Sequence, residues 1–426
     1  MTASATYRDY ADPGRIARAI EQLAGFTEPG RPYTRLIFSD EFHAARKWLT
    51  ESFKNLGLDC HIDAGGNLIG TRPAAAETPS PQVVIIGSHI DTVPAGGRYD
   101  GIAGVIAAME VVHYLNAQSL ELPFTLEIAD FLGEELNLWG TSCLGSRHMA
   151  GLIDAEMLAR KDERGRTLGD EIAACGGSGI PPTGPRSDAA GIRACFELHI
   201  EQARSLEDAG ADIGIVTTLP AIERYAIAVN GTAGHSGTTP MAGRQDALVT
   251  AASIIRKVSA LAGTIAARSN EYFCATIGKI EVLPNGPTII PGRVEMMLDV
   301  RSTGDEAKAE FLAGLSAALG EAGREGCGID RTLLATSPGA PMDSGLQAAL
   351  GKEAKALGLA GMDVASGAGH DSAHLSRFAP VAMVFIPCRG GLSHCPEEEA
   401  DPDAIAKGAA VITRSVLALA EENGAC

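Results

Sequence analysis

The sequence predicts an α/β protein with a central, mostly parallel sheet, into which a smaller α+β sandwich is inserted. Three observations support this prediction. Short apolar, β-branched runs such as VVIIG (83–87) are typical of strands buried on both faces of a parallel sheet. These runs alternate with stretches whose apolar residues recur every three or four positions, as in helices. Between residues 220 and 335 the strands instead alternate apolar and polar residues, as half-exposed antiparallel strands do.

The larger domain is expected to comprise residues 1–219 and 336–426. It begins with helices over 13–57, followed by a strand pair that turns at Gly65-Gly66. The remaining elements predicted here are strands at 58–62, 67–71, 83–87, 125–132, 196–200 and 381–386, and a helix over 101–115. The Gly- and Pro-rich stretches Pro181–Pro185 and Ser337–Pro341 are expected to be loops or hinges.

The inserted domain is expected at 220–335. Its alternating segments are 221–231, 272–284 and 292–302, and its helices are expected near 246–262 and 305–321. Two strands, two helices and two further strands fit a small α+β sandwich.

The charge composition of the chain excludes some classes of binding partner. The 426 residues include 53 acidic and 35 basic side chains, for a formal charge of −18. An acidic surface repels nucleic acids and anionic membranes, so neither is an expected partner. The first 25 residues lack the apolar core of a secretory signal, and we expect no apolar run long enough to span a bilayer. Nine cysteines without metal-type spacing fit reduced thiols in a cytoplasmic protein.

Residues that can bind metal follow the predicted parallel strands. VVIIG leads into Ser88-His89, TLEIADFL leads into Glu134-Glu135, the third strand leads into His199, and VAMVFI leads into a loop with His394. Because ligands bind outside the carboxyl ends of the strands in such sheets, we expect these side chains at one rim. Asp100, in GGRYDG, precedes a helix beside them.

Five ligands exceed the three that a catalytic zinc ion usually takes from a protein. A shared carboxylate explains the number: His89, Asp100 and His199 would bind one ion, and Asp100, Glu135 and His394 a second. Imidazole and carboxylate ligands favour zinc first, with manganese, cobalt and nickel also open.

Two further acidic residues accompany these ligands. Asp91 lies two residues after His89, on the same side of an extended segment, where its carboxylate can orient the ligand imidazole. Glu134 is adjacent to Glu135 and points elsewhere, so it can take and deliver the proton of a water activated by the metals. The sequence therefore predicts a two-metal hydrolase.

Longer segments resemble the amidase/hydantoinase/carbamoylase branch of the di-metal aminoacylase-type peptidase superfamily, which includes N-carbamoyl-L-amino-acid hydrolases and allantoate amidohydrolases. The most specific are GSHIDTVPAGGRYDG (87–101) and HIEQ (199–202). GHSGTTPM (234–241), PGRVEMMLDVR (291–301) and SGAGHD (366–371) match further family segments.

The resemblance implies roles for other residues. The insert would be a lid that also forms a homodimer. His235 on this lid would stabilise the oxyanion at a metal site, expected to be the partner subunit's. Arg301 would bind the carboxylate of a small-molecule amide substrate. Gln202 would hydrogen-bond the ureido or amide group, and Gly367 and Gly369 would offer backbone groups.

Some positions depart from the family pattern. Thr288 stands where the family carries a substrate-binding Asn, although Asn285 lies three residues earlier. Ala203 replaces the usual Gly after HIEQ, and Trp139 in GEELNLWG could line the pocket. These departures concern the substrate more than the reaction.

The resulting hypothesis is hydrolysis of an N-carbamoyl (ureido) amide of an L-amino-acid-like substrate to the amine, carbon dioxide and ammonia. Allantoate or another ureido compound, an N-acyl amino acid and a dipeptide are alternative substrates for the same chemistry. A non-catalytic metal-binding dimer would lack Glu134 or a ligand, and none is missing. A nucleotide-dependent dehydrogenase would need GxGxxG after a strand, and VVIIG is not followed by it.

Overall fold

The computed structural model describes residues 5–75, 82–324 and 326–422. It divides into two compact units. The large unit comprises Met1–Thr217, Pro341–Val364 and His370–Cys426, and the small unit comprises Thr218–Ala340 and Ala365–Gly369. The pentapeptide 365–369 therefore packs with the small unit although it lies far outside the 220–335 segment in sequence.

The large unit is built on one eight-stranded sheet with the order β1-β2-β4-β3-β5-β16-β6-β15. Four pairs of neighbouring strands are parallel: β4–β3, β3–β5, β5–β16 and β6–β15. The other three pairs, β1–β2, β2–β4 and β16–β6, are antiparallel. The strands are β1 (Asp59–Ile62), β2 (Leu68–Arg72), β3 (Val83–Ser88), β4 (Thr125–Asp130), β5 (Ile192–Ile200), β6 (Ile213–Val216), β15 (Gly361–Val364) and β16 (Val381–Ile386). The predicted α/β class with a mostly parallel sheet is confirmed.

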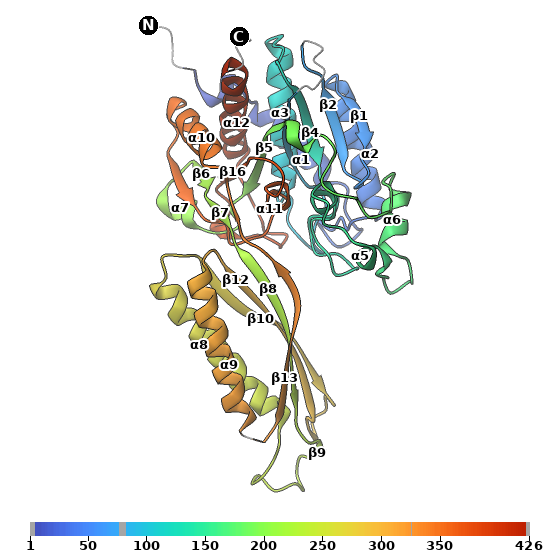
Figure 1. The fold of residues 1–426 in the computed structure, drawn as a ribbon, viewed down its shortest axis with the longest axis vertical. Helices are drawn as coiled ribbons and strands as arrows, with labels where there is room; N and C mark the ends of the chain where they lie inside the picture. Colours follow the sequence, from blue (N-terminus) through green and yellow to red (C-terminus); the bar gives the residue numbers. More distant parts are fainter. Residues whose placement is uncertain (1–4, 76–81, 325, 423–426) are drawn as a thin grey trace. The chain divides into compact units, whose positions relative to one another are not determined.

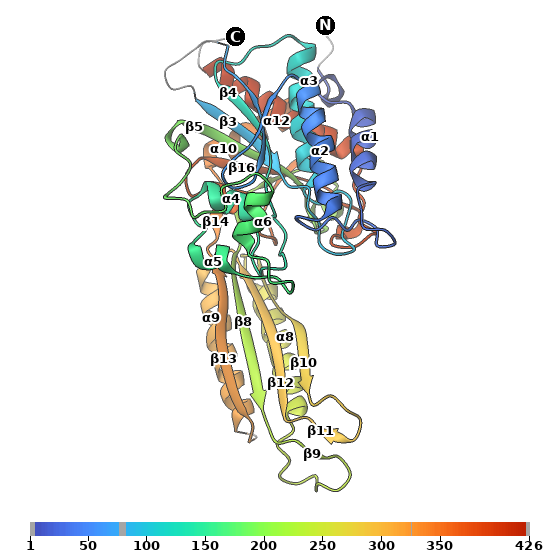
Figure 2. The same ribbon diagram turned by 90° about the vertical axis from the view of Figure 1, so that its right-hand side faces the viewer.

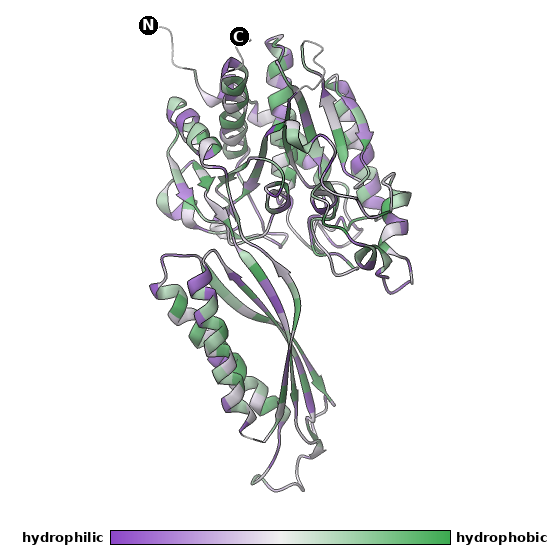
Figure 3. Cartoon of the chain, viewed as in Figure 1, coloured by the Kyte–Doolittle hydropathy of each residue, from purple (hydrophilic) through white to green (hydrophobic). Residues whose placement is uncertain are grey.

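The helices of the large unit follow from the apolar pattern. Helices α1 (Pro13–Ala24), α3 (Ile102–Ala117), α10 (Ser344–Ala356) and α12 (Pro402–Glu422) contact one another in one layer, and α2 (Asp40–Asn55) packs on β1 and β2. Every residue of β3 and β16 is buried, which explains their uninterrupted apolar runs. Figure 3 shows the hydrophobic colour gathered in α12 and the central strands.

Short elements complete the large unit. They are η1 (Tyr7–Asp9), α4 (Leu144–Met149), α5 (Ala155–Ala159), α6 (Leu168–Ala174), η2 (Ala189–Gly191), α7 (Ser205–Ala209), α11 (Ser372–Leu375) and η3 (Arg389–Gly391). At the boundary between the units in sequence, β14 (Ala340–Pro341) pairs with β7 (Thr218–Leu219), and Ser337 is the last residue of another strand. The predicted loop Ser337–Pro341 is therefore wrong at both ends.

The small unit is a four-stranded antiparallel sheet covered by two helices (Figures 1 and 2). Along the chain it contains β8 (Ala221–Asn230), β9 (Gly234–His235), α8 (Ala247–Arg268), β10 (Phe273–Leu283), β11 (Ile289–Ile290), β12 (Arg293–Ser302), α9 (Asp305–Gly323) and β13 (Gly328–Ser337). The sheet order is β10-β12-β8-β13, and β9 pairs separately with β11. In β12, buried and less buried residues alternate, as one covered face requires.

Helix α8 corrects one expectation. Its 22 residues are long and apolar enough to cross a membrane by length and composition alone. However, the helix has a buried stripe that includes Ala251, Ile254, Val258 and Ile265, and this stripe belongs to the core shared with β8, β12 and α9. This spacing of three, four and seven residues is that of an amphipathic helix packed on a sheet.

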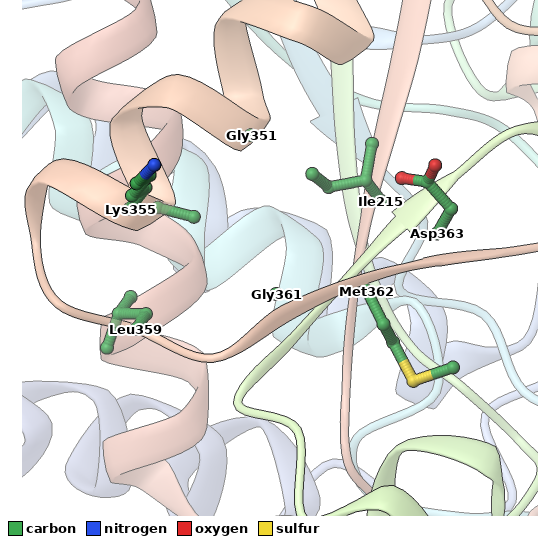
Figure 4. Close-up of a pocket in the computed structure, with 8 residues that line it drawn as sticks. Ile215, Gly351, Lys355, Leu359, Gly361, Met362 and Asp363 are labelled. Atoms are coloured by element: carbon green, nitrogen blue, oxygen red, sulfur yellow. The ribbon is translucent and has the colours of Figure 1, made fainter.

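One pocket of the large unit lies away from the predicted site. It has a volume of about 420 Å³ and lies where α10 meets β6 and β15 (Figure 4). Lys355 and Asp363 are the charged side chains among its lining residues, and none of the residues predicted to bind metal or substrate lines it. It therefore takes no part in the site described next.

Candidate di-metal active site

The parallel strands bring the predicted ligands to one edge of the large sheet. Ser88, at the end of β3, pairs with Asp130, at the end of β4, and His89 and Glu134-Glu135 follow these two ends. His199 lies near the end of β5, opposite Phe385 of β16. The site therefore forms at the carboxyl ends of four neighbouring strands, as expected of an open α/β sheet.

Asp100 lies at the centre of two groups of side chains. Its Oδ1 is 3.0 Å from His199 Nε2 and 3.8 Å from His89 Nε2. Its Oδ2 is 3.1 Å from His394 Nε2, which in turn is 3.4 Å from Glu135 Oε1. The groups His89–Asp100–His199 and Asp100–Glu135–His394 each bring their ligand atoms close enough to hold one ion. This is the arrangement in which one carboxylate is shared by two metals.

The imidazoles of the first group are oriented as metal ligands. His89 Nδ1 lies 3.1 Å from the carbonyl oxygen of Asp91, and His199 Nδ1 lies 2.9 Å from that of Ile200. When Nδ1 donates to a carbonyl, Nε2 carries the lone pair, and in both residues Nε2 faces Asp100. His89 Nε2 is buried and has no hydrogen-bond partner. A buried, unpaired nitrogen lone pair beside a carboxylate fits a bound cation.

The electrostatics of the carboxylates also fit bound cations. Burial raises the pKa of Glu134 well above its usual value, and the charge of Glu135 adds to this effect. Burial and the charge of Asp100 raise the pKa of Glu135 to about 7. Burial opposes the ionisation of Asp100, but the adjacent imidazoles of His199 and His394 hold its pKa well below the usual value. Divalent cations would stabilise these neighbouring carboxylates in their charged forms.

Gly101 is required beside these ligands for two reasons. Its φ of +69° lies in the region that favours glycine. A Cβ at this position would also lie 2.3 Å from the Nε2 of His89. A side chain at position 101 would therefore displace the His89 imidazole, and this explains the glycine after Asp100.

Asp91 acts on the glutamate pair as well as on His89. Its Oδ1 accepts the backbone N–H of Glu134 and its Oδ2 accepts that of Glu135, both at 3.2 Å. The carboxylate also lies 3.5 Å from His89 Nδ1. Asp91 thus links the ends of β3 and β4.

Asp100 and its backbone are held by hydrogen bonds to residues that the sequence pattern did not single out. Glu398, which is 2% exposed, accepts the backbone N–H groups of Tyr99 (2.8 Å) and Asp100 (3.0 Å). Its other oxygen accepts from Ser393, whose hydroxyl lies 3.0 Å from Asp100 Oδ2. The segment CPEEEA contains three consecutive glutamates, and only tertiary structure shows which one is buried.

Gln202 and Trp139 lie differently from the expectations. The Gln202 side-chain N–H donates to Asp100 Oδ2 at 2.9 Å, so this predicted substrate ligand also contacts the metal-ligand set. Trp139 is 4% exposed, packs edge-on against Phe38 and donates its indole N–H to Arg166 O. The ring of Trp139 is therefore part of the core of the large unit.

His370 adds a buried imidazole to the site. It lies in the segment SGAGHD, was not predicted individually, and has its ring centroid 4.4 Å from that of His199. Next to it in the sequence, Asp371 accepts a hydrogen bond from the hydroxyl of Ser146. Glu197 accepts hydrogen bonds from the N–H and hydroxyl groups of Ser372. These buried contacts fix the segment after the small-unit pentapeptide 365–369.

In the small unit, Arg301 and the two predicted glycines lie near one end of the sheet. Arg301 donates through Nε to Asp299 (2.8 Å) and through Nη1 to the carbonyl of Gly367 (3.1 Å). Gly369 faces Ile222, which pairs with Arg301.

The other predicted small-unit residues lie beyond the opposite end of β12. His235 pairs with Ile289, and the carbonyl of Thr288 accepts the N–H of Ser236, so Thr288 is adjacent to His235. Asn285 is exposed in the loop that leads to β11. His235 Nδ1 accepts two backbone N–H groups, from Gly237 and Thr238, which leaves Nε2 as the proton-bearing nitrogen.

Two imidazole–carboxylate groups that share one aspartate, with a further buried glutamate beside them, define a metal-dependent hydrolase. The chain belongs to Peptidase family M20/M25/M40, whose model matches residues 85–418. This confirms the resemblance from which the family was expected.

Several similar proteins are named as amidohydrolases or amidases. The chain is 35% identical to an N-carbamoyl-L-amino-acid amidohydrolase of Paenarthrobacter aurescens, covering 96% of this chain and 98% of the relative. It is 33% identical to an allantoate amidohydrolase of Bacillus subtilis, with coverage of 91% and 92%. A solved amidase of the hydantoinase/carbamoylase family from Burkholderia vietnamiensis superposes with a TM-score of 0.85 at 33% identity, covering 98% and 99%.

Proposed function

We propose that this protein is an amidohydrolase that cleaves the N-carbamoyl (ureido) amide of an L-amino-acid-like substrate, releasing the amine, carbon dioxide and ammonia. The observation that carries the proposal is the pair of ligand groups joined at Asp100 beside Glu134, on a chain similar over nearly its whole length to ureido amidohydrolases.

His89, Asp100 and His199 would hold one divalent ion, and Asp100, Glu135 and His394 the other. Zinc fits these nitrogen and carboxylate ligands first, and manganese, cobalt and nickel are alternatives. When bound, the ions supply Lewis acidity and lower the pKa of water.

Glu134 is the proposed general base and acid. Its Oε2 faces His89 Nε2 at 3.7 Å, so the carboxylate is directed toward the first ligand group. It would take a proton from the attacking water and deliver it to the leaving nitrogen. Asp91 would hold Glu134 and His89 in place through the contacts described above.

Substrate binding is assigned to the residues that the resemblance to the family singles out. The guanidinium of Arg301 is already oriented by Asp299 and would bind the substrate carboxylate. Gln202 would contact the ureido group, and Gly367 and Gly369 would provide backbone contacts. Thr288 and Asn285 would select the substrate beside His235, since Thr288 is adjacent to it.

The small unit supports a homodimer in which His235 serves the partner's site. His235 lies beyond the end of β12 that begins at Arg293. Arg301 lies eight residues further along this strand, so Arg293 and Arg301 are about 27 Å apart at 3.4 Å per residue. One small substrate cannot contact both residues of the same chain. We therefore propose that His235 donates its Nε2–H to the oxyanion formed in the partner subunit, and that the small unit is the dimerisation and lid domain.

A cytoplasmic location is proposed on the state of the cysteines. The eight cysteines in the described part of the chain are free thiols, which is usual for proteins of a reducing compartment.

The experiment is an ammonia-release assay with metal-stripped protein reloaded with zinc or manganese. Its panel contains N-carbamoyl-L-amino acids, their D isomers, allantoate, N-acetyl amino acids and dipeptides. We expect metal-dependent release from N-carbamoyl-L-amino acids. Preferential turnover of allantoate would favour the alternative function, allantoate hydrolysis, for which the Bacillus subtilis relative is named. Cleavage of acyl or peptide bonds alone would overturn the ureido assignment.

A further inference from the structure

The thiol of Cys143 lies beside the proposed general base. Its Sγ is 3.6 Å from Oε1 of Glu134 and 3.7 Å from the Glu134 carbonyl oxygen, both within hydrogen-bond range for sulfur. Cys143 is 5% exposed, so water does not compete freely for this contact. A thiol is a weak donor, but its acceptor here is a carboxylate, which strengthens the bond.

The two oxygens of Glu134 face different groups. Oε1 faces Cys143, whereas Oε2 faces His89 Nε2 at 3.7 Å. A donor on Oε1 restricts rotation of the carboxylate about its terminal torsion, which is otherwise broad. The contact with Cys143 therefore restricts the orientation of the carboxylate plane, so that the other oxygen is directed toward the ligand groups.

The backbone keeps Cys143 opposite Glu134. The residue has a φ of +54°, in the left-handed region that is uncommon for residues with a side chain. Its N–H donates to Glu134 O at 3.0 Å, and the next two N–H groups donate to Gly133 O and Leu132 O. Backbone in a sparsely populated region is often retained where it serves a site. Burial also raises the pKa of the Cys143 thiol well above its usual value, so the group remains a donor.

We propose that Cys143 is a positioning residue for the hydrolysis: its S–H···Oε1 hydrogen bond holds Glu134 so that Oε2 faces the reacting water and then the leaving nitrogen. This inference rests on the proposed function, because it acts through the proposed role of Glu134. It involves no covalent or redox step.

The test compares kcat, KM, metal content and thermal unfolding for Cys143→Ala, Cys143→Ser and Cys143→Gly. Cys143→Ala and Cys143→Gly both remove the thiol. Cys143→Gly is included because glycine adopts a positive φ without strain, so the test does not depend on the folding of Cys143→Ala. We expect kcat to fall roughly tenfold in both truncations, as for a lost hydrogen bond to a charged group, with KM and metal content unchanged. The hydroxyl of Cys143→Ser should restore most of the loss. Cys195→Ala, at a buried cysteine in β5, is the matched control and should keep its kcat.

A double-mutant cycle separates this inference from the proposed function. Glu134→Asp keeps a carboxylate but withdraws it from Cys143, so adding Cys143→Ala should cause no further loss of kcat. An equal loss in both backgrounds, or a wild-type kcat in the fully metallated truncations, would overturn the role of Cys143. A wild-type rate for Glu134→Gln would instead remove the proposed function itself.

Discussion

The carboxylate of Asp91 accepts the backbone N–H of Glu134 at 3.2 Å and thereby joins the ends of two adjacent parallel strands. Its second oxygen accepts the next N–H, that of Glu135, at the same distance. In Asp91→Asn, one oxygen is replaced by an NH₂ group that would point at a donor. We expect kcat/KM and metal affinity to fall roughly 10- to 100-fold, as for other residues that orient metal ligands.

Metal titration followed by assays at saturating metal would check the Asp91 prediction. Asp363→Asn, in the pocket beside β15, is the matched control because Asp363 lies outside the site. Unchanged metal affinity and activity in Asp91→Asn would show that the hydrogen bonds to the glutamate pair are not required.

The shared position of Asp100 predicts metal stoichiometry. Since Asp100 belongs to both ligand groups and His394 only to one, Asp100→Ala should lose both ions, whereas His394→Ala should retain one. Elemental analysis after dialysis would measure ions per chain. Two ions retained in Asp100→Ala would contradict a site in which this carboxylate is shared.

Arg301→Lys should weaken substrate binding more than turnover. A lysine keeps the charge but cannot reproduce the planar, two-pronged contact of a guanidinium with a carboxylate. We expect KM to rise roughly tenfold, the effect of about 1.4 kcal/mol, with a smaller change in kcat. Arg224→Lys, the other arginine paired with Asp299, serves as the control. The interpretation fails if substrates with and without a carboxylate respond equally to Arg301→Lys.

The strand separation between His235 and Arg301 predicts complementation between two inactive variants. A mixed dimer of His235→Ala and Glu134→Gln would contain one intact site, formed by Glu134 of one chain and His235 of the other. Random reassociation should therefore restore roughly a quarter of wild-type activity if subunits pair without preference. Each variant alone is the control, and no recovery in verified mixed dimers would place His235 outside the partner's site.

The metal-free protein should lose stability as the pH rises. The pKa of Glu135 is raised by burial from 4.5 to about 7, and that of His394 is raised by its hydrogen bond to Asp100 from 6.5 to about 9. A raised folded-state pKa contributes stability that is fully present below the unfolded value and is lost as the pH rises through the folded value. The relevant windows are therefore 4.5 to 7 for Glu135 and 6.5 to 9 for His394.

Thermal unfolding with and without chelator between pH 5 and 9 would test this expectation. The unfolding temperature of the metal-free protein should fall by on the order of a few °C across the range. The stabilisation by metal should grow with pH, because metal ligands must be deprotonated. A metal-free protein that becomes more stable with rising pH would contradict the assigned environments of Glu135 and His394.

Much of the fold was predictable because its signals are local. Buried parallel strands such as β3 and β16 require uninterrupted apolar runs, and their carboxyl ends meet at one edge whatever the details of packing. For that reason the five ligands could be predicted as one cluster, and the structure brings them together. Strands β6 and β15 were missed because four-residue segments such as GMDV carry little periodicity.

The environment of single side chains could not be predicted in the same way. Trp139 was expected at a pocket; in the structure its ring packs against Phe38, and its indole N–H donates to the carbonyl oxygen of Arg166, 27 residues along the chain. Glu398 looks like one of three surface glutamates, but its neighbour Gly97 leaves space for its carboxylate beneath Asp100.

The sequence alone determined the class of fold, the ligand types and their order along the chain, since these depend on residue chemistry and short-range periodicity. Only tertiary structure decided which atoms meet: that Asp91 bridges to the Glu134 backbone, that Cys143 faces Oε1, and that His235 lies beyond the end of β12 opposite to Arg301. These relationships arise only when packing fixes the ends of strands and loops relative to one another within each unit.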